Sequence, residues 1–149
     1  MLNISNNFVI QDFIPNHIYK RYKDKSIRFI NPKVVSMAEC LRNRFNSDVV
    51  INNWHKYNDG EYYFNFSGYR PPDCKKGSFM SRHKQGVAID IKIRGLLSSE
   101  IEEDINKNCD LMYKQSGLTT IEFGNKYHVH LSCEWTMTDQ LNIIKKAEK

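Results

Sequence analysis

Hydrophobic positions recur at helical spacing over residues 31–45. Asn31 is suited to a helix N-cap, and Pro32 is suited to the first helical position. The apolar residues of this segment fall on one helical face; they are Val34, Ala38, Leu41 and Phe45. The pattern predicts an amphipathic helix. The first thirty residues place short apolar groups among basic ones, which indicates a loop and a short helix that wrap the core.

Two more helices are expected further along the chain. In residues 99–117, Ser99 and Glu102 have the spacing of a capping box, and Gly117 is suited to end the helix. Its apolar face consists of Ile101, Ile105 and Met112. The polar segment from about Thr138 to Lys146 predicts a last helix that closes the chain.

Apolar runs separated by turn residues predict five strands, at residues 49–54, 62–66, 87–93, 118–123 and 127–132. An Asn-Asp-Gly turn joins the first two, which are expected to form a hairpin. The last two flank Gly124-Asn125-Lys126 and are expected to form another. The order of elements predicts an α+β fold with a small, mainly antiparallel sheet flanked by helices. We expect a single domain over residues 1–149.

The charge balance narrows the possible partners only slightly. The chain has 22 Lys and Arg against 17 Asp and Glu, a net charge of +5. This favours polyanions such as nucleic acid, phospholipid headgroups or the bacterial cell wall. We find neither a nucleic-acid-binding motif nor an apolar run long enough to span a bilayer, so neither nucleic acid nor stable membrane insertion is expected. The absence of signal-peptide features and the four scattered cysteines indicate a cytoplasmic product with reduced thiols, expected to be a monomer.

The candidate chemistry lies in histidines and one aspartate. His128 and His130 are two residues apart in a predicted strand, so they point to the same face. Asp90 lies in an apolar strand, where a carboxylate is costly unless it is paired. With His83 in the preceding loop, these residues offer the ligand types of catalytic zinc sites, which use three protein ligands and a water molecule. The alternative is that Asp90 pairs with a basic neighbour, Arg82 or Lys92, or is exposed on an edge strand.

The segment SRHKQGVAID, residues 81–90, matches Ser-x-His-x-x-Gly-x-Ala-x-Asp throughout. It resembles the zinc D-alanyl-D-alanine peptidases, a family that includes VanX- and VanY-like carboxypeptidases and the peptidoglycan endopeptidases of phage endolysins. FSGYRPP is similar to the family's Ser-Gly-Tyr-Arg-Ser-Pro segment, and NNFVIQDF to its N-terminal Asn-Phe-x-x-x-Glu-Phe. YHVHL is similar to the His-x-His ending of murein endopeptidases and hedgehog domains. The resemblance covers most of the chain, in order, and implies a hedgehog/D-Ala-D-Ala peptidase-like fold.

The resemblance also implies a set of site residues. It implies one zinc ion (Zn2+) per chain with three ligands: His83, Asp90 and His130. Arg70 would bind a substrate carboxylate or polarise the scissile carbonyl, while Ser81 and Tyr69 would contact the substrate. The implied activity is hydrolysis of amide bonds in peptidoglycan stem peptides, as a carboxypeptidase or as an endopeptidase. A phage endolysin of this kind would reach the cell wall after release by a holin or within the virion.

The general base is left open by the sequence. Many members of the family carry Glu or Asp three residues before the last histidine ligand, and this chain has Tyr127 there. His128 and Glu122 are the candidates that remain, and His128 together with Arg70 is also a candidate for stabilising the oxyanion. If neither acts as a base, the alternative is a non-catalytic, zinc-stabilised binding module or a structural module of a virion.

Overall fold

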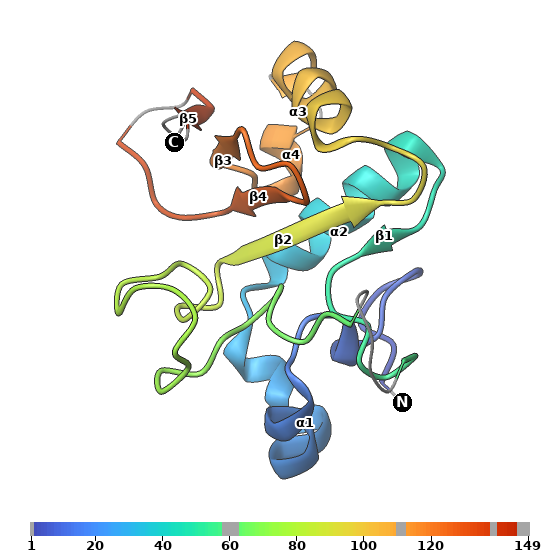
Figure 1. The fold of residues 1–149 in the computed structure, drawn as a ribbon, viewed down its shortest axis with the longest axis vertical. Coiled ribbons are helices and arrows are strands. Elements are labelled where there is room, and N and C mark those ends of the chain that lie inside the picture. The colour runs from blue at the N-terminus through green and yellow to red at the C-terminus, as the bar shows by residue number, and fades with distance from the viewer. Residues whose placement is uncertain (1, 58–62, 110–112, 138–139, 146–149) are drawn as a thin grey trace.

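The computed structural model describes residues 2–57, 63–109, 113–137 and 140–145. The N-terminal part is helical and consists of η1 (Ile10–Asp12), α1 (Asn16–Tyr22), η2 (Lys23–Phe29) and α2 (Pro32–Phe45). The strands are β1 (Val49–Val50), β2 (Ala88–Ile93), β3 (Thr120–Phe123), β4 (Val129–Ser132) and β5 (Asn142–Lys145). Between β2 and β3 lie α3 (Ser98–Lys107) and the short α4 (Lys114–Ser116). In Figure 1, α1 lies at one end of the molecule and α3 at the other.

The five strands form one mixed sheet in the order β1-β2-β4-β3-β5. Three neighbouring pairs are antiparallel, and the β3–β5 pair is parallel. The longest strand, β2, crosses the middle of the molecule (Figure 1). The predicted α+β class with a small, mainly antiparallel sheet flanked by helices is therefore confirmed, with one parallel pair in addition.

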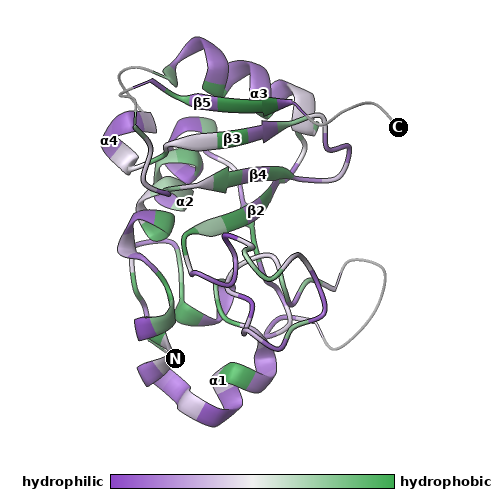
Figure 2. Ribbon diagram, turned by 90° about the vertical axis from the view of Figure 1, so that its left-hand side faces the viewer, coloured by the Kyte–Doolittle hydropathy of each residue, from purple (hydrophilic) through white to green (hydrophobic). Residues whose placement is uncertain are grey.

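The predicted helix over residues 31–45 is confirmed as α2. The side chain of Asn31 caps it by accepting a hydrogen bond from the backbone N–H of Lys33 at 3.0 Å. The buried face of α2 packs in the core with the inward residues of the sheet; it consists of Val34, Met37, Ala38 and Leu41. Figure 2 shows this division of hydropathy, with hydrophobic colour in the strands and hydrophilic colour along much of α1 and α3.

Alternation along β2 sets up the functional face of the sheet. Ile89, Ile91 and Ile93 are buried in the core. Asp90 and Lys92 lie between them and therefore point to the opposite face of the sheet. A strand this apolar keeps its register because a slip by one residue would turn the isoleucines out of the core.

The first predicted hairpin is wrong. Strand β1 ends at Val50, and residues 63–66 are not a strand. The two segments still lie side by side, because the N–H of Asn53 donates to the carbonyl of Phe64 at 2.9 Å and the N–H of Phe64 donates to Asn53 Oδ1 at 2.7 Å. A side-chain amide thus takes the place of a backbone ladder partner, as asparagine often does. The predicted turn lies outside the described residues.

The prediction of a helix at 138–146 is also wrong for the residues of this segment that the structure describes. Residues 142–145 form β5, paired in parallel with β3. Ile143 and Ile144 are β-branched residues that favour a strand, and the exposed edge of β3 supplies the hydrogen-bond partners. Thr138 and Lys146 lie outside the described residues.

The helical region predicted at 99–117 divides into α3 and α4. Helix α3 begins one residue early, at Ser98, and the N–H of Leu97 donates to Glu100 Oε2 at 2.7 Å. The predicted capping box is therefore wrong, and Glu102 instead accepts a hydrogen bond from the N–H of Gly124 at 3.1 Å. Gly117 ends α4 with φ of 89°, as predicted. Met112 lies outside the described residues.

Asp104 joins α3 to α2 and to Tyr113. Arg44 Nη2 donates to its carboxylate at 2.8 Å, and so does the hydroxyl of Tyr113. The hydrogen bond from Arg44 and then that from Tyr113 hold the pKa of Asp104 below its usual value against the opposing effect of burial. A group with a lowered folded-state pKa stabilises the fold above its unfolded pKa, about 3.9 for Asp, and loses that contribution as the pH falls through the folded value.

We therefore expect Asp104→Asn to lower the melting temperature at pH 7 by about 3–6 °C. Wild type and variant are expected to converge as the pH falls through the lowered folded-state pKa of Asp104, because the carboxylate is then protonated in both states. Thermal unfolding followed by circular dichroism across pH 2–7 measures the difference. Glu103→Gln, in an exposed pair with Lys107, is the matched control and is expected to change little. A difference for Asp104→Asn that is the same at every pH would contradict this account.

Two further findings concern the cysteines and the helices. All four cysteines, Cys40, Cys74, Cys109 and Cys133, are free thiols in the structure. No helix within the described parts of the chain has both the length and the apolar content to cross a bilayer.

Candidate metal centre

Three neighbouring strands align three polar residues in one row. In the antiparallel register, Asp90 of β2 is opposite His130 of β4, and His130 is opposite Glu122 of β3. Directly opposed residues of an antiparallel pair point to the same face of the sheet. His128 points to this face too, because it lies two residues before His130. The sheet thus gathers four of the predicted site residues on the face opposite α2.

His83 reaches this row from the turn that leads into β2. Its Nδ1 lies 2.8 Å from the carbonyl oxygen of Gly68, and its own carbonyl accepts from the N–H of Arg70 at 3.1 Å. Gly86 shapes the turn, because its φ is +71° and a Cβ there would lie 2.0 Å from the carbonyl oxygen of Phe29. Only glycine tolerates both the conformation and the close approach. The small residue in the middle of the SRHKQGVAID motif therefore has a structural cause.

Ligand atoms of His83, Asp90 and His130 converge on one point. Nε2 of His83 lies 3.2 Å from Asp90 Oδ1 and 3.2 Å from His130 Nδ1, and His130 Nδ1 lies 2.8 Å from Asp90 Oδ1. All three atoms lie within 4.8 Å of one another, and the group can hold a metal ion. His83 and Asp90 are buried, and His130 is partly exposed. The predicted metal ligands are thus brought together.

The converging atoms are chemically suited to a cation. The carbonyl oxygen of Gly68 can only accept, so His83 donates to it through Nδ1–H. In neutral His83 the lone pair is then on Nε2, which faces the carboxylate of Asp90 and the ring nitrogen of His130. A carboxylate oxygen is also an acceptor. Lone pairs of acceptor atoms that face each other at 3.2 Å repel, and a cation bound between them removes this repulsion. The three residues therefore fit a metal ion.

Asp90 is held as a charged group. Burial by itself raises the pKa of Asp90, but the close contacts of its carboxylate with His130 and His83 hold that pKa well below its usual range. Nη2 of Arg70 donates to Asp90 Oδ2 at 2.8 Å, on the side away from the histidines. The alternative in which Asp90 pairs with Arg82 does not hold, because Arg82 forms an ion pair with Glu134.

Arg70 is therefore a positioning residue as well as a candidate substrate contact. Its Nε donates to the carbonyl of Phe66 at 2.7 Å while Nη2 holds Asp90, and its side chain is 14% exposed. A lysine cannot bridge both acceptors in this planar arrangement. Outer partners of metal ligands typically contribute about 10- to 100-fold in metal affinity.

We expect Arg70→Lys to weaken metal affinity by about 10- to 100-fold. The measurement is a competition titration of the metal against a chromophoric chelator. Arg82→Lys changes the arginine of the SRHKQGVAID motif, which pairs with Glu134 instead of Asp90, and is expected to leave the affinity unchanged. Equal affinities for Arg70→Lys and wild type would contradict the positioning role.

The two candidate bases lie on the same face as the ligands. His128 Nε2 is 3.6 Å from Asp90 Oδ1 and accepts from Asn125 Nδ2 at 2.9 Å, so its proton is on Nδ1 when the ring is neutral. Glu122 is opposite His130 in the register and is partly exposed. The row formed by the three strands thus brings Glu122 beside the ligand set from a position eight residues earlier in the chain.

The remaining predicted residues lie differently. Tyr69 is buried at 8% exposure, and its ring stacks on Phe29 with a centroid distance of 5.2 Å. It acts as a packing residue here, which does not support the prediction that it contacts a substrate. Ser81 is partly exposed. Ser81 and Arg70 both lie against Gly77: a Cβ atom added to Gly77 would be 3.1 Å from Ser81 Oγ and 3.3 Å from Arg70 Nη1. Ser81 therefore lies near Arg70, where a substrate contact remains a prediction.

Two features of the site go beyond what the sequence predicts: the contact that orients His83, and the surroundings of Lys92, which the sequence offers only as a possible partner of Asp90. The carbonyl of Gly68 orients His83, and only its place in the motif FSGYRPP hinted at a role. Lys92 lies two residues beyond Asp90 on the same face, and its Nζ is 3.3 Å from Ser67 Oγ and 3.9 Å from the ring centroid of Phe64. Burial lowers the pKa of Lys92 to about 8; the charge of Asp90 opposes this shift.

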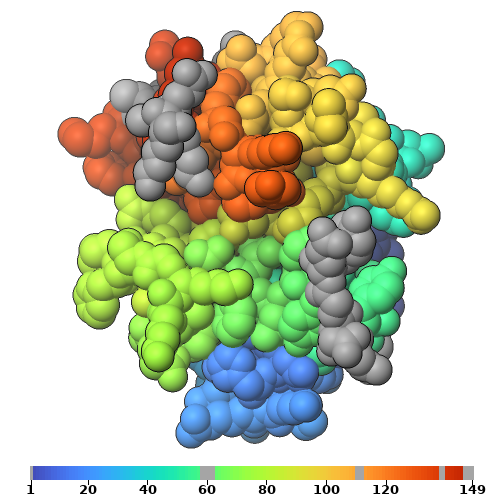
Figure 3. Space-filling view, in the orientation of Figure 1, coloured from blue at the N-terminus to red at the C-terminus, as the bar shows by residue number. Residues whose placement is uncertain are grey.

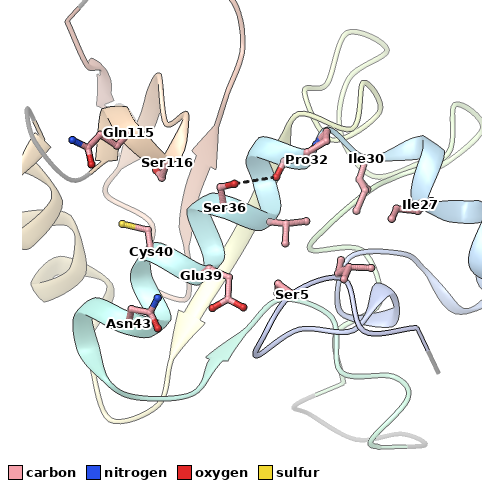
Figure 4. A pocket seen from close by; sticks show the side chains of 12 residues that line it. Ser5, Ile27, Ile30, Pro32, Ser36, Glu39, Cys40, Asn43, Gln115 and Ser116 are labelled. Carbon is pink, nitrogen blue, oxygen red and sulfur yellow. Dashed lines mark hydrogen bonds between the residues drawn. The ribbon is translucent and has the colours of Figure 1, made fainter.

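Cavities occur both near the site and away from it. A groove of about 1150 Å³ is lined by Lys92, Val50, Phe64 and Tyr127, among other residues. A separate cavity of about 650 Å³ lies over α2, lined by a mixture of polar residues, Glu39 and Cys40 among them, and apolar residues, and contains none of the candidate site residues (Figure 4). In the space-filling view of Figure 3, the green and yellow-green segments that precede β2 lie directly against the orange segment of β3 and β4.

Comparisons with known proteins add no support for the site beyond its geometry. No protein-family model matches the chain, and neither the curated proteins nor the solved structures yield a similar protein.

Proposed function

We propose that the protein is a zinc-dependent peptidase that hydrolyses amide bonds in peptidoglycan stem peptides. The observation that carries this proposal is the convergence of His83 Nε2, Asp90 Oδ1 and His130 Nδ1, with separations of 2.8–3.2 Å. Nitrogen and oxygen ligands about 2.0–2.1 Å from a tetrahedral zinc ion lie roughly 3.3 Å apart. Two imidazoles and one carboxylate are also a common ligand set of catalytic zinc, which keeps a fourth position open.

The residues around the ligand set have distinct roles in this proposal. Zinc, when bound, polarises a carbonyl group and lowers the pKa of a water molecule toward neutrality. Glu122 accepts the proton of the attacking water and passes it to the leaving amine. Arg70 fixes Asp90 and presents positive charge to the carbonyl oxygen of the substrate. His128, when its ring is protonated, donates a hydrogen bond to the same oxygen.

The substrate class rests on the resemblance of SRHKQGVAID and FSGYRPP to the D-alanyl-D-alanine peptidases, and on charge. A net charge of +5 suits an anionic cell wall. We propose the setting of a phage lytic enzyme that reaches peptidoglycan after release from the host cytoplasm. Cleavage by a carboxypeptidase and by an endopeptidase is equally compatible with this site.

One observation favours a second candidate function, a non-catalytic module stabilised by zinc. Tyr127 stands where the resembled family carries its acidic base, and its side chain is 75% exposed. A site that holds zinc without an effective base would stabilise the fold and bind its ligand without turnover.

Metal analysis and digestion of purified peptidoglycan together test the proposal. We expect about one zinc ion per chain and new peptide fragments, identified by mass spectrometry, whose ends name the bond. Zinc at this level with unchanged peptidoglycan would favour the non-catalytic module. Freshly purified protein without any bound metal would contradict both functions.

A further inference from the structure

Lys92 is a partly buried cation beside the candidate metal centre. It lies on the same face of β2 as Asp90, and the two are linked through Ser67, whose carbonyl accepts from the N–H of Asp90 at 2.7 Å and whose hydroxyl is 3.3 Å from Lys92 Nζ. The ammonium also lies 3.9 Å from the ring centroid of Phe64. These contacts hold Nζ at a defined place, on the strand position two residues beyond Asp90.

The ammonium of Lys92 lacks an ionic partner within the described parts of the chain. Asp90 directs its two carboxylate oxygens to Arg70 and to the histidines. Asp12, which also lines the groove, is paired with His55 at 3.3 Å and with Lys56 at 3.7 Å. A charge withdrawn from water is costly unless an opposite charge meets it, so an anionic ligand would complete the site.

The groove of about 1150 Å³ gives such a ligand a path to Lys92. Its lining combines apolar surface from Val50, Phe64 and Tyr127 with the basic side chains of Arg94 and Arg42. Asp48 also lines the groove and is exposed. A cleft with apolar walls and a few placed charges suits an extended peptide that carries a carboxylate.

We propose that this groove binds the part of an acidic peptide substrate next to the scissile bond, with a substrate carboxylate paired to Lys92 Nζ. This inference rests on the proposed function and adds a specificity determinant to it. Stem peptides offer two such groups, the free carboxylate of the γ-linked glutamate and the C-terminal carboxylate. Lys92 would then select free carboxylates over the corresponding amides.

Binding of labelled stem pentapeptides, read by fluorescence anisotropy, tests the inference without relying on turnover. Zinc-loaded protein carrying Glu122→Gln is titrated with the free peptide, with the glutamate amide and with the C-terminal amide, and mass spectrometry verifies that each peptide stays intact. We expect one of the two amidations to weaken binding by about 10- to 100-fold. Adding Lys92→Met is expected to weaken binding of the free peptide by the same factor as that amidation does. In the Lys92→Met variant, the amidation itself is expected to have no further effect.

Lys145→Met, at the exposed edge of the sheet in β5, is the matched control and is expected to leave all three affinities unchanged. Equal affinities for the free and the two amidated peptides would overturn the inference. A loss of affinity with Lys92→Met that is the same for all three peptides would also overturn it. Intact stem peptides after incubation of the wild-type protein, with the Lys92-dependent preference retained, would overturn the proposed hydrolysis and leave this binding site standing.

Discussion

Asp90→Asn is expected to lower the zinc affinity of the protein by more than about a hundredfold and to abolish hydrolysis. The substitution keeps the shape of the side chain and removes the only negative charge among the three ligands. Loss of an outer hydrogen-bond partner alone costs about 10- to 100-fold in affinity, so loss of a charged ligand exceeds that range. Chelator competition measures the affinity, and metal analysis after gel filtration measures the zinc that remains bound.

Two controls separate metal binding from folding. Glu122→Gln removes a carboxylate from the same row of the sheet without removing a ligand, and is expected to keep its zinc. Circular dichroism of Asp90→Asn is expected to show the wild-type secondary structure, because the isoleucines on either side still pack in the core. Full zinc occupancy in a folded Asp90→Asn variant would remove the assignment of this carboxylate as a ligand.

Glu122→Gln is expected to lower kcat by about 10²- to 10⁴-fold, the usual contribution of a positioned general base. Glutamine keeps the size of the side chain but cannot accept the proton of the attacking water. Register places Glu122 beside His130, whereas Nε2 of His128 already accepts a hydrogen bond from Asn125. Rates on a defined stem peptide, measured at saturating substrate, give the effect on kcat.

His128→Gln is the comparison that assigns the base. We expect a smaller loss, about tenfold, because this side chain is proposed to stabilise the oxyanion together with Arg70. A larger loss for His128→Gln than for Glu122→Gln would reassign the base to His128. Unchanged kcat in both variants, with zinc bound, would leave the mechanism without a base on this chain.

The strongest local signals in the sequence predicted the elements that build the site. Asn31 and Pro32 mark the start of α2, and the isoleucines of β2 specify a strand with Asp90 on its opposite face. The predicted ligands His83, Asp90 and His130 do converge, because one motif contains two of them and strand pairing supplies the third.

The errors and omissions involve partners distant in the chain. Residues 142–145 are polar enough to suggest a helix, but the free edge of β3 makes them a strand. Asn53 uses its side chain as a hydrogen-bond acceptor for Phe64, which no apolar pattern reveals. The pairing of Arg70 with Asp90 and the burial of Tyr69 against Phe29 likewise depend on how separate loops pack together.

Incorporation of heavy oxygen tests the central claim of metal-dependent hydrolysis most directly. Zinc-loaded protein is incubated with a defined stem pentapeptide in water enriched in oxygen-18, and the products are analysed by mass spectrometry. We expect one heavy oxygen in the carboxyl group formed at the cleaved bond, and no cleavage with Asp90→Asn or after removal of the metal by a chelator. An intact peptide with the zinc-loaded wild type, or cleavage that persists in the Asp90→Asn variant, would contradict that claim.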